Sequence, residues 1–161
     1  MSFEKKLDMF DDRIGEQNMP QRTFYVGMNN KFNNLFQTVG DNLFKEVSFK
    51  QEFALRCASF FREPPTIKDL ADFLGTSHQN TKQVLEKLEK KGYVQLVQDT
   101  NDRRKQRILI TDDGRRILEI YLVKGNEYLN LLFDGISEED LEIAIQVTMR
   151  MFENLKRVQD S

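Results

Sequence analysis

The sequence predicts a mainly helical α+β protein in which one small β-hairpin stands between helices. Three observations lead to this prediction. Apolar residues recur every three or four positions over most of the 161 residues. Only 3 Pro and 8 Gly are present to interrupt helices. The periodicity changes from 3.6 to 2 just once, directly after Gly92, which favours a single pair of strands.

The first sixty residues predict three helices. The first is short and amphipathic and stops before Pro20, and the second is about six turns long. Their apolar stripes are Phe3, Leu7, Phe10 and Ile14, followed by Phe24, Met28, Phe32, Leu35, Phe36 and Val39. The third helix should begin at the capping box of Ser48 and Gln51 and run toward Phe61, because Pro64 and Pro65 cannot continue it.

Two shorter helices follow at the spacing of a helix-turn-helix. Thr66 and Asp69 cap the first, which ends at Gly75. Ser77 caps the second, which ends at Gly92. The predicted inward residues are Ile67, Leu70, Ala71 and Leu74 on the first, and Val84, Leu85 and Leu88 on the second. A three- or four-residue turn that contains Gly is typical of this motif.

Residues 93–97 and 107–110 alternate as strands, and a polar, basic loop joins them. Thr111 should start a helix of about six turns, and Ser137 with Asp140 should open the last helix. The order is that of a winged helix-turn-helix with flanking N- and C-terminal helices that form a dimerisation domain. The expected parts are 1–45 (N-terminal helices), 46–111 (DNA-binding domain, with the helix-turn-helix about 66–91 and the wing about 93–111) and 112–161 (C-terminal helices). Because the flanking helices have unused apolar faces, a homodimer is predicted.

The net charge of -2 hides an uneven distribution. Ten basic and six acidic residues lie between Lys82 and Arg116, so this stretch carries +4 and the other residues sum to -6. A basic segment of this kind indicates an anion-binding surface, although a solvated charged face has the same composition. One Cys and one His exclude an internal disulfide and a clustered zinc site, and no apolar run is long enough to cross a membrane. We therefore expect an intracellular, cytoplasmic protein with no cofactor and no metal.

The candidate DNA contacts lie on the second helix of the motif and on the wing. In a helix-turn-helix this helix presents its N-terminal side chains to base edges, and we expect the stretch from Ser77 to Gln83 to be exposed for that purpose. The predicted contacts are Ser77, His78, Gln79, Asn80, Lys82, Gln83, Arg103, Arg104 and Lys105, with Asp102 orienting the wing. A guanidinium on a narrow loop fits a minor groove. The alternatives are an ordinary capped helix start and a solvated turn.

The stretch DRRKQRILITDDG, residues 102–114, resembles the wing signature of the multiple-antibiotic-resistance regulator (MarR) family: Asp-x-Arg, an aliphatic strand that ends in Thr, and then x-x-Gly. LEKKGYV, residues 88–94, looks like the junction between recognition helix and wing in that family. The resemblance implies a homodimeric transcription factor on a pseudo-palindromic double-stranded DNA operator, usually a repressor released by a small aromatic ligand. It also implies that Asp102 orients Arg104 in the minor groove. Gln83 stands where many relatives carry a basic residue, so the operator sequence is not carried over.

Other functions find little support in the sequence. Ser77 and His78 are adjacent and cannot act as a nucleophile and its base, and no glycine-rich phosphate loop is present, so no enzymatic activity is expected. Cys57 lies among apolar residues and is predicted to be an inert core thiol. The Phe and Met stripes are read as core, so no effector-binding residues are assigned. The competing hypothesis is a winged helix that binds a protein partner rather than DNA.

Overall fold

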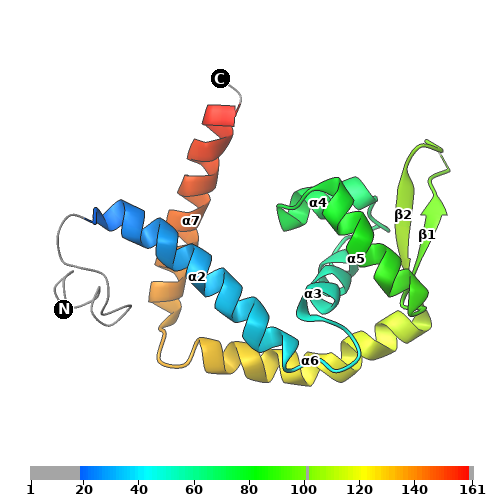
Figure 1. Ribbon diagram of the computed structural model, residues 1–161, viewed down its shortest axis with the longest axis horizontal. Helices are drawn as coiled ribbons and strands as arrows, with labels where there is room; N and C mark the ends of the chain where they lie inside the picture. The colour runs from blue at the N-terminus through cyan, green and yellow to red at the C-terminus, as the bar shows by residue number, and fades with distance from the viewer. Residues whose placement is uncertain (1–18, 101, 160–161) are drawn as a thin grey trace. The chain divides into compact units, whose positions relative to one another are not determined.

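A computed structural model of the chain describes residues 19–100 and 102–159. Within these ranges the elements follow the predicted order (Figure 1). The helices are α2 (Gln21–Asp41), α3 (Phe49–Ser59), α4 (Ile67–Leu74), α5 (His78–Lys90), α6 (Asp112–Leu132) and α7 (Glu138–Gln159), and the strands are β1 (Val94–Gln98) and β2 (Gln106–Ile110). The helix predicted around Phe3 to Ile14 lies outside the described residues. The described residues therefore confirm a mainly helical winged helix-turn-helix.

The predicted caps set where the helices begin. The Ser48 hydroxyl accepts from the backbone N–H of Gln51, whose side chain accepts from the backbone N–H of Ser48. Thr66 and Asp69 form the same reciprocal box at the start of α4. These two pairs satisfy backbone donors that the first turn of a helix would otherwise leave without partners. At the other end of α4, Gly75 adopts a left-handed conformation with φ of 63°, which favours glycine.

The helix-turn-helix is held by a small apolar core. Leu70 of α4 is fully buried, as are Leu85 and Leu88 of α5. Helix α3, which carries the buried Leu55, packs against both. The turn between α4 and α5 is closed by a 2.7 Å hydrogen bond between the hydroxyls of Thr76 and Thr81. Burial of each large aliphatic side chain contributes about 1.5–3 kcal/mol to stability. This core fixes the direction in which α5 presents its first turn.

The hairpin has the two predicted strands, although β1 is displaced by one residue and β2 begins one residue earlier than expected. β1 and β2 are antiparallel, with Val94 opposite Ile110 and Leu96 opposite Ile108. Tyr93, expected in the strand, instead completes the end of α5, because its backbone N–H donates to the carbonyl of Leu88 at 3.0 Å. Tyr93 therefore lies outside the strand ladder, which begins at Val94.

The junction between wing and α6 explains the Thr-x-x-Gly part of the sequence. The Thr111 hydroxyl donates to the carbonyl of Gly92 at 2.6 Å and accepts from the backbone N–H of Gly114 at 3.0 Å. A Cβ added to Gly114 would lie 2.1 Å from the carbonyl oxygen of Tyr93. Glycine is therefore required there, since the start of α6 crosses close to the end of α5.

The described residues fall into two compact units, which divide between Ile120 and Tyr121. The second unit contains the rest of α6 and all of α7. None of the residues of α7 is buried. Its exposed large apolar side chains are Ile143, Ile145, Val147, Met149, Met151, Phe152, Leu155 and Val158. None of the described helices is long and apolar enough to span a membrane.

Cys57 is buried in α3, as its apolar neighbours predict. Burial, together with the carboxylate of Glu52, raises the pKa of the Cys57 thiol to about 11. The thiolate is the reactive form, so at neutral pH this group is almost entirely in its unreactive, protonated state. These properties are those of a core thiol.

Candidate nucleic-acid interface

The first turn of α5 presents the predicted polar side chains to solvent. Ser77 caps the helix by accepting from the backbone N–H of Asn80 at 3.2 Å. The exposed residues at this end are Ser77, His78, Gln79, Asn80 and Gln83. Lys82 is partly covered and lies 4.0 Å from Glu86, one turn along the helix. The amide and imidazole groups are therefore accessible, which reading a base edge requires.

Thr81 departs from the expected exposed set. Its side chain is 2% exposed and is used in the hydroxyl contact with Thr76 that closes the turn. The expectation that the whole stretch from Ser77 to Gln83 faces outward is wrong at this position. The reason is helical geometry: the fourth residue of α5 turns back toward α4, whereas its neighbours point outward.

The charges of the helix start also favour an anion. The first turn of α5 contains no acidic residue, whereas its last turn carries Lys87 and Lys90. The backbone N–H groups and the helix dipole make a helix N-terminus attractive to negative groups such as phosphate. In contrast, α7 carries three acidic residues in its first turn, Glu138, Glu139 and Asp140. The electrostatic character of α5 is that expected of a helix whose first turn faces DNA.

The wing carries the predicted pair of Asp102 and Arg104. The Arg104 guanidinium donates to both carboxylate oxygens of Asp102, from Nε at 3.0 Å and from Nη2 at 3.2 Å. The backbone N–H of Arg104 donates to the same carboxylate at 3.1 Å. These hydrogen bonds hold the pKa of Asp102 below its usual value. The Arg104 side chain is nevertheless 91% exposed, so it is oriented and still available to a partner.

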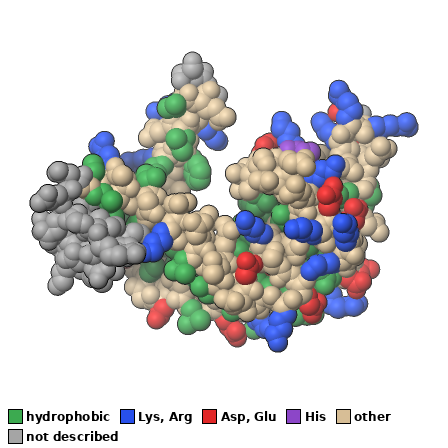
Figure 2. Space-filling view, viewed as in Figure 1, with side chains coloured by type: hydrophobic (Ala, Val, Ile, Leu, Met, Phe, Trp, Pro, Cys, Tyr) green, Lys and Arg blue, Asp and Glu red, His purple; other side chains and the backbone are tan. Residues whose placement is uncertain are grey.

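The other two basic residues of the loop are less constrained. Arg103 is exposed, and Lys105 places its ammonium group 3.8 Å from the Asp102 carboxylate. The structure thus brings Asp102, Arg104 and Lys105 together at the tip of the wing. Figure 2 shows Lys and Arg side chains gathered around the wing and the helix-turn-helix on the visible face. The single histidine of the chain lies among them.

The sequence did not single out two residues at the base of the wing. Asp99 is 4% exposed, and its carboxylate pairs with the guanidinium of Arg107. Arg107 also donates from Nη1 to the carbonyl of Pro64 at 2.7 Å. Sequence reasoning counted both residues as charges of the basic segment. The sequence does carry a signal for them. Asp99 directly follows the first strand, and Arg107 directly precedes Ile108, which is buried in the second strand.

An open cleft of about 770 Å³ lies between the beginnings of α4 and α5 and the wing. His78 and Lys82 line it from the recognition helix, and Arg104 and Lys105 line it from the wing. Asp69 also lines the cleft. Hydrogen bonds from Thr66 lower the pKa of Asp69, and the positive charges of Arg107 and Lys105 lower it by a smaller amount. Two predicted groups of site residues therefore face one concave surface.

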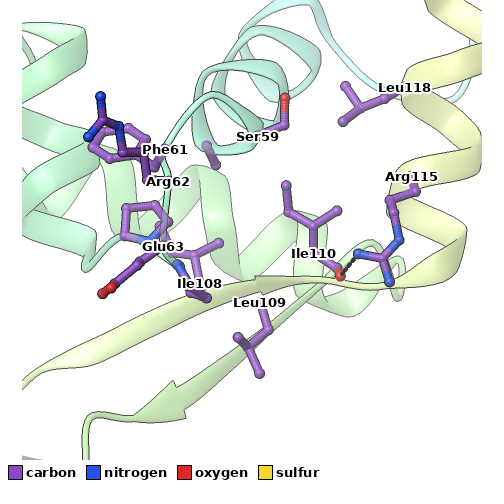
Figure 3. A pocket seen from close by; sticks show the side chains of 12 residues that line it. Ser59, Phe61, Arg62, Glu63, Ile108, Leu109, Ile110, Arg115 and Leu118 are labelled. Atoms are coloured by element: carbon purple, nitrogen blue, oxygen red, sulfur yellow. Dashed lines mark hydrogen bonds between the residues drawn. The ribbon is translucent and has the colours of Figure 1, made fainter.

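A second hollow, of about 330 Å³, lies behind the wing (Figure 3). Its wall includes Phe61, Ile108, Ile110 and Leu118, so it is largely apolar. The Arg115 guanidinium at its edge donates to the carbonyl of Ile110 at 2.9 Å, the contact drawn in Figure 3. Among the described residues no group of three or more His, Cys, Asp or Glu side chains is arranged to hold a metal ion.

Comparisons with known proteins agree with this geometry. Residues 61–105 match the sequence model of the MarR family. The transcriptional activatory protein BadR of Rhodopseudomonas palustris is 28% identical over 96 residues, which are 59% of this chain and 55% of BadR. The transcriptional repressor MprA of Escherichia coli is 25% identical over 91 residues, 56% of this chain and 52% of MprA. The matched part of the chain thus spans about half the length of these relatives.

The solved structures extend the likeness in fold to most of the chain. The Staphylococcus aureus MepR–DNA complex superposes with a TM-score of 0.72 at 20% sequence identity, covering 81% of this chain and 97% of MepR. At this identity the likeness establishes the fold alone. The match reaches well beyond residues 61–105, so the flanking helices belong to the shared architecture.

Proposed function

Because the chain carries the winged helix-turn-helix of the MarR family, we propose that it is a transcriptional regulator that binds duplex DNA as a homodimer. The observation that carries the proposal is the Asp102–Arg104 pair, in which both carboxylate oxygens hold a guanidinium that remains 91% exposed. At this exposure the pair contributes little to stability, and the guanidinium that it orients stays accessible to a partner. A guanidinium presented in this way suits a narrow minor groove, where the phosphate potential is strongest.

The recognition helix supplies the complementary contact in the major groove. The amides of Gln79 and Asn80 can form two hydrogen bonds with an adenine, and Lys82 can reach phosphate or guanine. Ser77, His78 and Gln83 are also exposed and add polar contacts around these two amides. Arg103 and Lys105 flank Arg104 and supply sequence-independent contacts to phosphates. We propose that the protein acts on DNA in the cytoplasm. No catalytic step is assigned to it.

The homodimer gives this site its second half. Two recognition helices related by a two-fold axis read a pseudo-palindrome when their centres are roughly 34 Å apart, one turn of B-DNA. The exposed apolar side chains of α7 supply a surface for such a dimer. We propose repression as the mode of regulation. MprA is named a repressor and BadR an activator, so the position of the bound site relative to the promoter is the deciding measurement.

Selection of bound sites from random duplex DNA tests the proposal directly. We expect a pseudo-palindromic site and a steep loss of affinity with salt, because each phosphate contact releases counterions. Asn80→Ala and Gln79→Ala should each cost about 1–3 kcal/mol at one base position of the selected site while changing affinity for random DNA little. Quantitative binding to single-base variants of the site measures this loss. Glu153→Ala, on α7, is the control substitution.

Two outcomes would count against this assignment. Equal losses on selected and random DNA would mean that Gln79 and Asn80 do not read bases. A flat salt dependence with no selected site would favour a winged helix that binds a protein partner. The acid-free first turn of α5 and the exposed Arg104 of the wing distinguish the two hypotheses, because protein binding does not require an arginine aimed at a minor groove.

The apolar hollow behind the wing supports a further part of the proposal, release from DNA by a small aromatic ligand. Phe61, Ile108 and Leu118 offer apolar contact, and the charged lining residues are Arg62, Glu63 and Arg115, the last of which also pairs with Asp112. Benzoate and its hydroxylated derivatives are the probes to add to the binding assay. If one of these ligands weakens DNA binding by the unmodified protein but not by Leu118→Trp, whose indole fills the hollow, the site is supported. The same weakening in the filled variant would contradict it.

A further inference from the structure

The tip of the wing is connected to the start of the helix-turn-helix by two Arg–Asp pairs, which are joined through the backbone N–H of Asp102. We name this set of four residues, Arg107, Asp99, Asp102 and Arg104, the wing relay. Arg107 pairs with Asp99, Asp99 accepts from the backbone of Asp102, and Asp102 holds Arg104. Only its outer end, Asp102 and Arg104, belongs to the DNA contacts predicted from the sequence.

The inner end of the wing relay is attached to the segment that precedes α4. The Arg107 guanidinium donates from Nη1 to the carbonyl of Pro64 at 2.7 Å while Nε donates to Asp99. The backbone N–H of Ile108 donates to the carbonyl of Pro65 at 2.9 Å, and Thr66 forms a β-bridge with Arg107. Thr66 is also the N-cap of α4. The wing is therefore fastened at the residue where the helix-turn-helix begins.

Asp99 links the two ends because each of its carboxylate oxygens has a different partner. Oδ2 accepts from Arg107, and Oδ1 accepts from the backbone N–H of Asp102 at 2.8 Å. The backbone N–H of Asp99 donates to the carbonyl of Lys105 at 3.0 Å, which closes the loop. Asp99 is 4% exposed, whereas the Arg107 side chain is 33% exposed. Solvent therefore reaches the guanidinium but hardly reaches the carboxylate that it holds.

We propose that Asp99 and Arg107 are positioning residues for DNA binding, which set the place of the Arg104 guanidinium relative to the recognition helix. This inference rests on the proposed function. A dimer that reads a major groove with α5 and a minor groove with the wing needs a fixed distance between the two. A two-stranded hairpin alone is flexible, since isolated hairpins are marginally stable. Directional, charge-assisted hydrogen bonds between Pro64 and the loop remove that freedom.

A purely stabilising role would not require this chemistry. Replacement of a buried ion pair by apolar side chains of similar volume is often neutral or favourable for stability. What the pair provides is a defined geometry, because the planar guanidinium fork reaches Asp99 and Pro64 at the same time. Lysine keeps the charge of Arg107 but not the planar fork. Arg107→Lys therefore tests the effect of wing position on DNA binding without changing the charge of the wing.

The test uses the full-length protein and two measurements. The first is hydrogen exchange of the backbone amides of Asp99, Asp102 and Lys105 in the free protein. The second is the ratio of affinities for two duplexes with the same selected bases under α5 but A·T or G·C pairs under the wing. For Arg107→Lys we expect exchange of these amides to become about tenfold faster and the A·T preference to fall about tenfold toward unity. The slope of affinity against salt should not change, because the net charge is preserved.

Asp99→Asn is the second variant, because it keeps the size of the side chain and the acceptor for Asp102 but removes the charge that holds Arg107. Its extra positive charge should strengthen binding to random DNA, so a lower A·T preference cannot be attributed to lost electrostatic attraction. Arg116→Lys is the matched control, since Arg116 pairs with Asp113 on the exposed start of α6. That control should behave like the unmodified protein in both measurements.

The outcomes separate the proposals from one another. Unchanged exchange in folded Arg107→Lys would refute the relay as a constraint on the wing. Faster exchange with an unchanged A·T preference would refute positioning and leave a structural contact. If the unmodified protein prefers neither duplex and selects no site, the proposed function fails and positioning fails with it. In that case the exchange data still report whether the relay holds the loop.

Discussion

Arg104→Ala is expected to raise the dissociation constant for the selected operator by roughly 30- to 800-fold, because a homodimer places two of these side chains on one site. Each wing arginine is assigned about 1–2 kcal/mol of binding free energy, the lower part of the range for specific arginine contacts. The mutation removes a group that is 91% exposed and packs against nothing in the core, so folding should be unaffected. The loss should therefore lie in DNA binding and not in stability.

Fluorescence anisotropy with a labelled operator duplex measures this loss. Arg104→Lys keeps the charge but loses the planar fork, so it should bind more tightly than Arg104→Ala and still show a reduced preference for A·T pairs. Arg157→Ala removes one cation from the last turn of α7 and is the control for net charge. Unchanged affinity in folded Arg104→Ala would rule out a role for the wing in DNA binding.

A second readout follows from the electrostatics of the wing tip. Hydrogen bonds from the side chain and backbone of Arg104 lower the pKa of Asp102, so removing the guanidinium should raise that pKa toward its ordinary value. A titration of the Asp102 carboxyl group followed by NMR measures the change. Because Asp102 stays ionised at neutral pH in both proteins, the loss of DNA affinity should not depend on pH near 7.

Local chemistry explains why so many boundaries could be predicted from sequence. The start of α4 depends on two side chains three residues apart, and its end depends on a glycine with positive φ. Such signals act within one turn of chain and need no tertiary information. The pairing of the strands follows in the same way, since alternating apolar residues must share the buried face. The Asp102–Arg104 contact spans two residues and was predictable for the same reason.

The features that the sequence did not reveal depend on residues distant in the chain. Arg107 contacts Pro64, 43 positions earlier, because the fold brings β2 beside the segment that precedes α4. The burial of Thr81 likewise depends on the packing of α5 against α3 and α4. The apolar hollow is formed by three separate segments, so no single stretch of sequence carries its signal. Neither composition nor periodicity reports such contacts.

Ile145→Asp is expected to convert a dimer into a monomer and to abolish operator binding at concentrations that saturate the unmodified protein. Ile145 is 54% exposed in the single chain, and it lies on a helix of which no residue is buried. In a symmetric dimer that covers this face, one substitution buries two unpaired carboxylates at about 3–5 kcal/mol each. The dimer dissociation constant should therefore rise by at least about a thousandfold.

The effect on DNA follows from the symmetry of the site. A monomer can bind only one half-site at a time. In the dimer, binding of one recognition helix holds the second near its half-site, and loss of this linkage should lower the affinity for the operator roughly 10²–10⁴-fold. Sedimentation equilibrium should report twice the 19.0 kDa of one chain for the unmodified protein and 19.0 kDa for the variant. Circular dichroism should show that the helix-turn-helix and wing remain folded, because Ile145 belongs to the other compact unit.

Gln146→Asp is the matched control, since it places the same charge one residue further along α7. Gln146 lies on the polar stripe of the helix, where its side chain donates to Glu142 at 3.3 Å. A dimer through the apolar face leaves that stripe in water, so the control should stay dimeric and bind the operator normally. If both variants dissociate, the added charge or loss of helicity is responsible and the apolar face is not the interface. If neither dissociates, the two recognition helices are joined by a surface other than this face of α7.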